Sequence, residues 1–138
     1  MSPTLSKSAR IASWIAQLVA AGILGMASFF KLTSAPESIA LFQQLGVEPW
    51  GRYAVGLYEG VTTLLLLIPR TAALGGLLAV GLMVGAILTH LTTLGIAVNG
   101  DPSLFMMALT TLAAGLVIVA IRRAELPLFG RRFAVQAG

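Results

Sequence analysis

Residues 71–96 carry the sequence TAALGGLLAVGLMVGAILTHLTTLGI, and this stretch decides the fold. It contains no Asp, Glu, Lys or Arg, and its one ionisable side chain is His90. A helix needs about 20 apolar residues to cross a hydrocarbon core of roughly 30 Å. The stretch exceeds that length, so it predicts a transmembrane helix.

Two further apolar blocks lie before this stretch and one lies after it. They span about residues 11–30, 50–68 and 102–121. Each is long enough to cross a bilayer as a helix. Together with residues 71–96 they predict an all-α fold, a transmembrane four-helix bundle that covers residues 11–123.

The breaks between the last three blocks are short and strongly marked. Pro69 and Arg70 alone separate the second block from the third, which predicts a tight antiparallel helical hairpin. The turn NGDP at residues 99–102 precedes the last block. Asp101 is placed to cap that helix and Pro102 suits its first position. These signals agree with the limits of the apolar blocks.

The composition agrees with a membrane protein and excludes several other classes. The chain has 138 residues, of which 57% are hydrophobic and 10% are charged, whereas soluble domains have about 45–50% apolar and about 25% charged residues. The absence of cysteine excludes thiol–disulfide chemistry, iron–sulfur ligation and cysteine-based zinc sites. A single histidine excludes a bis-histidine haem within the chain. We predict no metal site, and no basic run interleaved with aromatic residues indicates a nucleic-acid surface.

The positions of Lys and Arg predict the orientation in the membrane. Four spans place both termini on one side, and that side carries most of the nine Lys and Arg residues. They are Lys7, Arg10, Arg70, Arg122, Arg123, Arg131 and Arg132. The other side carries only Lys31 and Arg52. Because cytoplasmic segments are enriched in Lys and Arg, residues 1–10 should form a cytoplasmic N-terminus and residues 124–138 a cytoplasmic tail.

A short helix is predicted between the first two spans. Ser34 and Glu37 have the spacing of a capping box, and Pro36 lies near the first turn. Apolar residues follow at helical spacing, and Gly46 suits the end of the helix. We expect an amphipathic helix over about Pro36 to Leu45 on the outer face. It serves as an interfacial anchor or, alternatively, as a lid over a cavity open to the outer side.

Two GxxxG motifs predict close helix packing. Gly56 and Gly60 lie in the second span, and Gly81 and Gly85 lie in the third. Small residues at this spacing let helix backbones approach closely in lipid. The motifs indicate packing within the bundle or, alternatively, the face of a homo-oligomer.

Glu59 is the charged residue placed deepest in the predicted membrane. It lies nine residues after Trp50, roughly 13 Å along the helix and close to the midplane. An ionisable residue within a span is a functional hypothesis by default. Glu59 shares a helical stripe with Arg52, whose side chain either reaches inward or snorkels outward. Tyr58 lies beside Glu59 and is a further candidate for ligand binding.

Other polar candidates lie on the first and third spans. Gln17, Ser28 and Lys31 share a stripe of the first span. Lys31 ends that span on the outer side, where it snorkels to the interface, pairs with Glu59 or faces a ligand. His90 lies twenty residues beyond Arg70, roughly 30 Å along the helix and near the outer boundary.

Four ionisable residues therefore fall in the outer half of the bundle. They are Lys31, Arg52, Glu59 and His90. This distribution predicts a polar funnel that opens outward and ends at Glu59. The funnel suits the polar head of a lipophilic ligand such as a quinone, with Glu59 and His90 handling protons and Lys31 and Arg52 attracting the head. The ligand's tail would lie among Met83, Met106 and Met107, which are otherwise core gap fillers.

Five segments together resemble the DoxX and DoxX-like family of small four-helix membrane proteins. They are GILGMASFFKL (residues 22–32), FQQLGVEPW (42–50), GLYEG (56–60), LLLLIPRTAALGG (64–76) and GAILTHL (85–91). They carry Lys31, Glu59 and His90 in that order. The resemblance implies a four-helix bundle in the cytoplasmic membrane of a bacterium or archaeon. It also implies a relationship to a subunit of a thiosulfate:quinone oxidoreductase.

Three functions follow as hypotheses. The first is a quinone- or lipophile-binding subunit of a membrane redox system, in which a bound quinone and membrane or peripheral redox subunits supply the electron transfer that the side chains of this chain lack. The second is a non-enzymatic scaffold or assembly factor in which Glu59 and a cation specify the bundle. The third is an acid–base enzyme that acts on a lipid-soluble substrate.

Overall fold

The computed structural model describes residues 5–126. The predicted N-terminal segment 1–10 is therefore described only from Leu5 onward. Of the predicted tail 124–138, all but the first three residues lie outside the described residues.

The described chain is all-α, as predicted. Its four long helices and one short helix are α1 (Lys7–Leu32), α2 (Pro36–Gln44), α3 (Trp50–Leu67), α4 (Ala72–Thr89) and α5 (Ser103–Arg122). Three shorter helical segments are η1 (Pro69–Thr71), the π-helix η2 (His90–Leu94) and η3 (Arg123–Glu125). Within residues 5–126 no strand forms, and one isolated bridge joins Val98 to Asp101.

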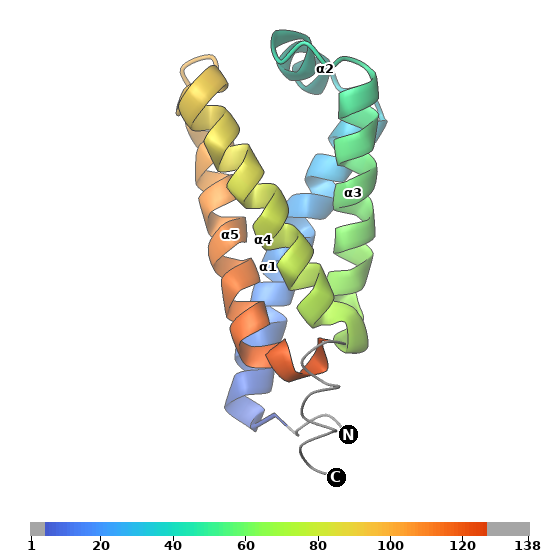
Figure 1. The fold of residues 1–138 in the computed structure, drawn as a ribbon, viewed down its shortest axis with the longest axis vertical. Coiled ribbons are helices and arrows are strands. Elements are labelled where there is room, and N and C mark those ends of the chain that lie inside the picture. The colour runs from blue at the N-terminus through green and yellow to red at the C-terminus, as the bar shows by residue number, and fades with distance from the viewer. Residues whose placement is uncertain (1–4, 127–138) are drawn as a thin grey trace.

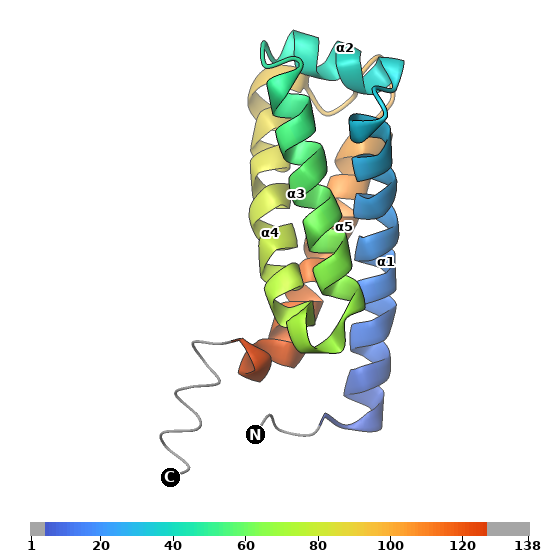
Figure 2. The same ribbon diagram turned by 90° about the vertical axis from the view of Figure 1, so that its right-hand side faces the viewer.

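The four long helices form an antiparallel bundle (Figures 1 and 2). Helix α3 packs against α1 and α4, and α5 packs against α4 and α1. Helix α2 lies across one end, and α1 begins and α5 ends at the other (Figure 2). The pairs α1–α3 and α4–α5 diverge toward the end that α2 covers (Figure 1). We call the end with α2 the outer end and the opposite end the inner end.

The GxxxG motif of α3 packs against α1, which confirms packing within the bundle for this motif. A Cβ on Gly56 would lie 3.0 Å from Cβ of Lys31, and one on Gly60 would lie 3.0 Å from Oγ of Ser28. Ser28 also donates a 2.7 Å hydrogen bond to the carbonyl oxygen of Gly56. The two backbones approach closely because neither glycine has a side chain.

The GxxxG motif of α4 does not pack in this way. A Cβ on Gly85 would meet no atom of the described residues within 4 Å, and one on Gly81 would reach only Oη of Tyr58 at 4.0 Å. Packing within the bundle is therefore wrong for this motif. Two other glycines of α4 provide the close packing instead: Gly75 lies against the backbone of Leu66, and Gly76 lies against Ile118 of α5.

The turns follow the sequence signals with two corrections. Helix α2 begins at Pro36 as predicted and is followed by Gly46 at a φ of 77°. The predicted capping box is wrong, because Ala35 is the N-cap residue and no side chain caps the helix. Helix α5 begins one residue later than predicted, at Ser103, so Pro102 and not Asp101 is its N-cap residue. Asp101 lies one residue before the cap, where its Oδ1 accepts the Ser103 N–H at 2.9 Å.

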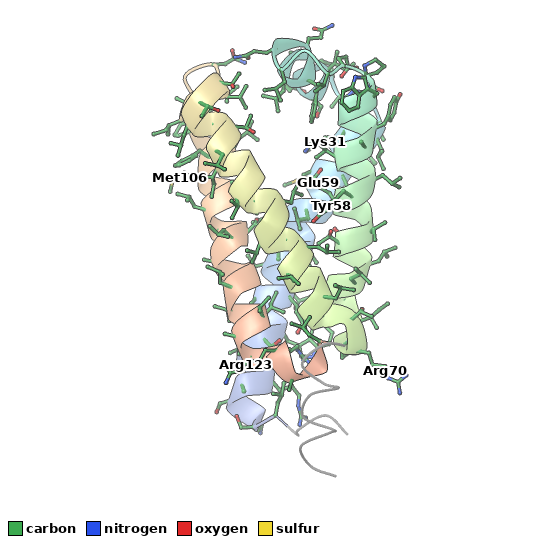
Figure 3. The ribbon with its side chains drawn as sticks, in the orientation of Figure 1. Lys31, Tyr58, Glu59, Arg70, Met106 and Arg123 are labelled. Carbon is green, nitrogen blue, oxygen red and sulfur yellow. The ribbon has the colours of Figure 1, made fainter. Side chains whose placement is uncertain are left out.

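Three helical stretches are long and apolar enough to cross a membrane: Lys7–Leu32, Pro69–Leu94 and Ser103–Arg122. Helix α3 has 18 residues and fills the fourth position of the bundle, but Arg52 and Glu59 lower its hydropathy. Arg70 and Arg123 lie near the inner end, whereas Lys31 and Glu59 lie in the outer half (Figure 3). The chain is thus a multi-pass membrane protein with a polar region in its outer half.

Candidate functional site

The centre of the outer polar region is an ion pair between Lys31 and Glu59. Nζ of Lys31 lies 3.0 Å from Oε1 of Glu59 and donates a hydrogen bond to Oε2 at 3.3 Å. The Glu59 side chain is 5% exposed and the Lys31 side chain is 16% exposed. The lysine side chain is therefore the more accessible partner. Of the alternatives for Lys31, the structure shows pairing with Glu59.

The small residues of α1 and α3 bring this pair together. Lys31 lies in the last turn of α1, and Glu59 lies in the middle of α3. Gly56 lies beneath the stem of Lys31, where a Cβ would be only 3.0 Å from the lysine Cβ. Ser28, one turn earlier on α1, is buried and bonded to the Gly56 carbonyl. This hydrogen bond of Ser28 thus holds α1 against α3, the two helices that carry the ion pair.

Arg52 does not pair with Glu59. Its Nε lies 2.9 Å from both carboxylate oxygens of Glu48, and its Nη2 lies 2.9 Å from Oε1 of the same residue. Its Nη1 donates to the carbonyl oxygen of Lys31 and to Oγ of Ser34. Ser34 therefore receives Arg52 instead of capping α2. Although Arg52 is only 3% exposed, it is satisfied by the turns on either side of α2 and fastens this helix to the bundle.

Tyr58 and His90 are hydrogen-bonded to backbone carbonyl groups and not to the ion pair. Oη of Tyr58 donates to the carbonyl oxygen of Leu78 at 2.8 Å and joins α3 to α4. Nδ1 of His90 lies 2.9 Å from the carbonyl oxygen of Gly95, and its ring meets that of Phe105 edge-on at 5.6 Å. Because a carbonyl only accepts, Nδ1 carries the proton. In the singly protonated form of the ring, Nε2 is then the acceptor nitrogen.

The π-helix sets the position of His90. The residue is 5% exposed and is the first of the five residues of η2. The N–H of Gly95, which has a φ of 81°, donates back to the His90 carbonyl and closes the segment. Single π-turns are frequent at functional sites. The sequence predicted the depth of His90 near the outer boundary but gave no sign of this turn.

Gln17 belongs to a second polar cluster near the inner end. Its Nε2 donates to the carbonyl oxygen of Leu66 at 2.7 Å, and its Oε1 accepts from Ser13 at 2.6 Å and from Nε of Arg122 at 3.0 Å. Arg122 Nε also lies 2.6 Å from Oγ of Ser13. All three side chains are buried. Gln17, one of the residues predicted to bind ligand, thus belongs to the hydrogen-bond network of the inner end.

The sequence carries a signal for this inner cluster. Ser13 and Gln17 are one turn apart on the face of α1 that also carries Ser28, and Arg122 ends α5. Counting Lys and Arg residues uses Arg122 only to predict topology. The structure adds that its guanidinium group enters the bundle and joins α5 to α1.

The residues 5–126 contain no group of three or more His, Cys, Asp or Glu side chains that could hold a metal ion.

A family model for the DoxX-like family matches residues 15–120. The chain belongs to the DoxX-like family. The match runs from α1 into the last turns of α5 and so includes Gln17, Lys31, Glu59 and His90. No curated protein and no solved structure matches the chain.

Proposed function

We propose that this DoxX-like protein is a quinone- or lipophile-binding subunit of a membrane redox system. It lies in a bacterial or archaeal cytoplasmic membrane with four spans and both termini inside. The observation that carries the proposal is the Lys31–Glu59 ion pair in the outer half of the bundle, whose carboxylate is buried within a membrane-spanning helix bundle. Ionisable groups within the membrane are rare and mark substrate paths, proton relays or ligand counter-ions.

The packing of α3 supports the fourth span. Helix α3 lies between α1 and α4, and its 18 residues are about 27 Å long at 1.5 Å per residue. Its charges are covered, because Arg52 is 3% exposed and Glu59 is 4% exposed. Its lipid-facing residues are large and apolar: Leu57, Val61, Leu64 and Leu67. A helix with covered charges and an apolar outer face is suited to lipid.

The absence of cysteine allows a direct test of this topology. Single cysteines are introduced at Ser8, Gln43 and Ala97, which are exposed positions in the structure. In intact cells a membrane-impermeant maleimide should label Gln43→Cys and Ala97→Cys but not Ser8→Cys. Labelling of only one of the two outer positions would contradict four spans.

The pair offers complementary groups to the head of a lipophile. The Lys31 ammonium group donates hydrogen bonds only, so it suits a carbonyl oxygen, whereas the Glu59 carboxylate accepts them. Lys31 is the accessible partner, with 16% of its side chain exposed. The ligand's apolar tail would lie between the diverging helix pairs or in lipid. His90 stays a predicted proton-handling residue, with Nε2 as its acceptor.

Electron transfer in this proposal comes from the bound ligand and from a partner subunit. The chain has no cysteine, so a quinone or another redox cofactor must carry the electrons. The role of this chain is to bind the head group and to exclude water from it.

Binding of an added quinone tests the proposal. The protein is purified in lipid nanodiscs, its native lipids are extracted and analysed, and decyl-benzoquinone is titrated against it. We expect a co-purified quinone, saturable binding, and an affinity at least about tenfold lower in Lys31→Met. Lys7→Met, an exposed lysine at the start of the same helix, is the matched control and should bind normally. No co-purified quinone and no binding by the unaltered protein would refute the proposal.

A specific observation favours a scaffold as the second candidate. Lys31 and Glu59, and likewise Arg52 and Glu48, satisfy one another within the chain. Replacing both partners of such a pair with apolar residues is often neutral for stability. The double variant Lys31→Met with Glu59→Met should therefore fold in both cases. It keeps its function in the cell if the protein is a scaffold and loses quinone binding if the first proposal holds.

A further inference from the structure

The imidazole of His90 is buried, yet only one of its two ring nitrogens has a partner. The residue is 5% exposed. Nδ1 lies 2.9 Å from the carbonyl oxygen of Gly95, whereas Nε2 forms no hydrogen bond with any of the residues 5–126. Buried polar atoms in native proteins nearly always have a partner, so Nε2 requires an explanation.

The π-turn directs His90 toward the interior of the bundle. The next five residues, 91–95, are all exposed or half-buried. The turn closes where the N–H of Gly95 donates to the His90 carbonyl oxygen at 2.7 Å, five residues back along the chain. Gly95 therefore contacts His90 twice: its N–H binds the histidine backbone, and its carbonyl oxygen binds the histidine ring.

The backbone conformation of Gly95 makes both contacts possible. Its φ is 81° and its ψ is 164°, a region that is essentially restricted to glycine. An added Cβ would meet only the carbonyl oxygen of Ala97, at 3.9 Å. Space does not require glycine at this position, but the backbone conformation does. A residue with a side chain would strain the turn that brings the carbonyl oxygen to the ring.

The ring of His90 has a second support on α5. The Phe105 ring, in the first turn of α5, meets it edge-on at 5.6 Å. A flip of the imidazole would replace Nδ1 by a carbon atom and would break the hydrogen bond to Gly95. The orientation of the ring is therefore set from the turn and from α5. His90 follows the last residue of α4, at the outer end of the bundle (Figure 1).

The contact with Gly95 also selects the tautomer of His90. The hydrogen bond at one ring nitrogen decides which form the other nitrogen takes. A backbone carbonyl only accepts, so Nδ1 carries the proton and Nε2 keeps its lone pair. A group that satisfies Nε2 must therefore donate a hydrogen bond.

We propose that Gly95 is the positioning residue of His90, and that it fixes the imidazole so that Nε2 accepts a hydrogen bond from a hydroxyl group of the bound lipophile. This inference rests on the proposed function, in which His90 handles protons. The hydroxyl groups of a hydroquinone head donate to Nε2, whereas the carbonyl groups of a quinone have no hydrogen to donate. His90 thus contacts the reduced form of the ligand.

The single histidine of the chain allows a specific test. The protein is labelled with a heavy nitrogen isotope in the histidine ring and placed in nanodiscs, and nitrogen NMR of the neutral ring shows which ring nitrogen carries the proton. Gly95→Ala is compared with Gly100→Ala. Gly100 is the matched control, because its φ is also positive, at 78°, and an added Cβ would meet no described atom within 4 Å.

We expect the proton on Nδ1 alone in the unaltered protein and in Gly100→Ala, and a mixture of both tautomers in Gly95→Ala. Decyl-benzohydroquinone, added without oxygen, should shift the Nε2 signal of the unaltered protein while Nδ1 keeps its proton. Decyl-benzoquinone should leave the Nε2 signal unchanged. The affinity for the hydroquinone should be lower by about fivefold in Gly95→Ala and unchanged in Gly100→Ala.

A proton on Nε2 in the unaltered protein, or an unchanged tautomer in folded Gly95→Ala, would overturn the positioning role of Gly95. The first result needs no variant, so the proposal is tested even if Gly95→Ala does not fold. A bound hydroquinone that leaves the Nε2 signal unchanged would overturn Nε2 as its acceptor. The two proposals fail separately. If neither probe binds, the proposed function fails, whereas the tautomer still decides the role of Gly95.

Discussion

The outer and inner polar clusters of this bundle contain similar groups but use them differently. At the inner end Gln17 and Arg122 are bound by Ser13 and by the Leu66 carbonyl, and Gln17 is fully buried. In the outer half Lys31 and Glu59 pair with each other, and 16% of the lysine side chain stays exposed. The inner cluster is thus enclosed by the bundle, whereas the outer pair is partly accessible, as the proposed function requires.

The inner cluster also completes the end of α3. The last carbonyl groups of a helix have no partner within it. Gln17 supplies one for Leu66, and Thr71 Oγ1 supplies one for Leu65 at 2.9 Å. A glutamine from α1 therefore acts as a cap for α3, which explains why a polar side chain is kept at a fully buried position.

Gln17→Leu should have the largest effect on stability and should break the inner cluster alone. It leaves the Leu66 carbonyl without a donor and removes an acceptor from Arg122, which should lower the free energy of unfolding by about 2–3 kcal/mol. Thermal unfolding in nanodiscs measures the loss, with the exposed Gln43→Leu of α2 as the control. Quinone binding by the folded fraction should be unchanged. A loss of binding at full stability would instead make Gln17 part of the ligand site, as its position on the α1 stripe first indicated.

Gly75→Ala and Gly85→Ala should have opposite effects on the free energy of unfolding, because Gly75 is tightly packed at the inner end of α4 and Gly85 is not. A Cβ on Gly75 would lie 2.9 Å from the backbone nitrogen of Leu66, so alanine forces the helices apart and should cost about 1–3 kcal/mol. Gly85 has no such neighbour, so alanine there should stabilise the protein by up to about 1 kcal/mol through helix propensity. Thermal unfolding of both variants gives the comparison. Destabilisation by Gly85→Ala would show that its face packs against a second copy of the chain.

Glu59→Gln should have a smaller effect on stability than Gln17→Leu and a larger effect on binding. The glutamine keeps an oxygen for Lys31, so the free energy of unfolding should fall by only about 1 kcal/mol. The negative charge beside Lys31 is lost, and the position can no longer accept two hydrogen bonds through two oxygens. Titration with decyl-benzoquinone should show an affinity lower by about tenfold or more. Unchanged affinity would show that the ligand does not contact the ion pair.

The sequence predicted the long-range architecture well because that architecture depends on hydropathy and turn residues. The apolar blocks, the Pro69–Arg70 break and Gly46 each correspond to a helix or its end. It also predicted Lys31 and Glu59 as candidates, since charges within apolar blocks stand out. Their pairing was one of several alternatives, because the choice depends on the contact of Gly56 with the lysine stem.

The partners of several polar residues could not be predicted from the sequence, for one physical reason. Arg52, Ser34 and Gln17 each have a partner on another helix or turn, and periodicity along one helix does not identify such partners. The capping box at Ser34 failed because the nearby guanidinium of Arg52 takes up that hydroxyl. Similarly, Gly81 and Gly85 have the spacing of a packing motif, but the side chains around them leave that face uncovered.

The smallest predicted effect lies in the turn before α5, outside the membrane. Oδ1 of Asp101 accepts from the hydroxyl and the N–H of Ser103, and these hydrogen bonds lower the pKa of Asp101 below its ordinary value of 3.8. The unfolded chain therefore takes up a proton at a higher pH than the folded one. The stability contributed by these hydrogen bonds is present above pH 3.8 and is lost as the pH falls below it.

Thermal unfolding between neutral pH and pH 3 should show this loss as a small decrease in Tm. In Asp101→Asn the decrease should be smaller, because asparagine also caps helices but does not titrate. Ser103→Ala should lower the Tm at neutral pH by removing the hydroxyl donor. Equal pH dependence in Asp101→Asn and the unaltered protein would show that other carboxylates govern the acid response.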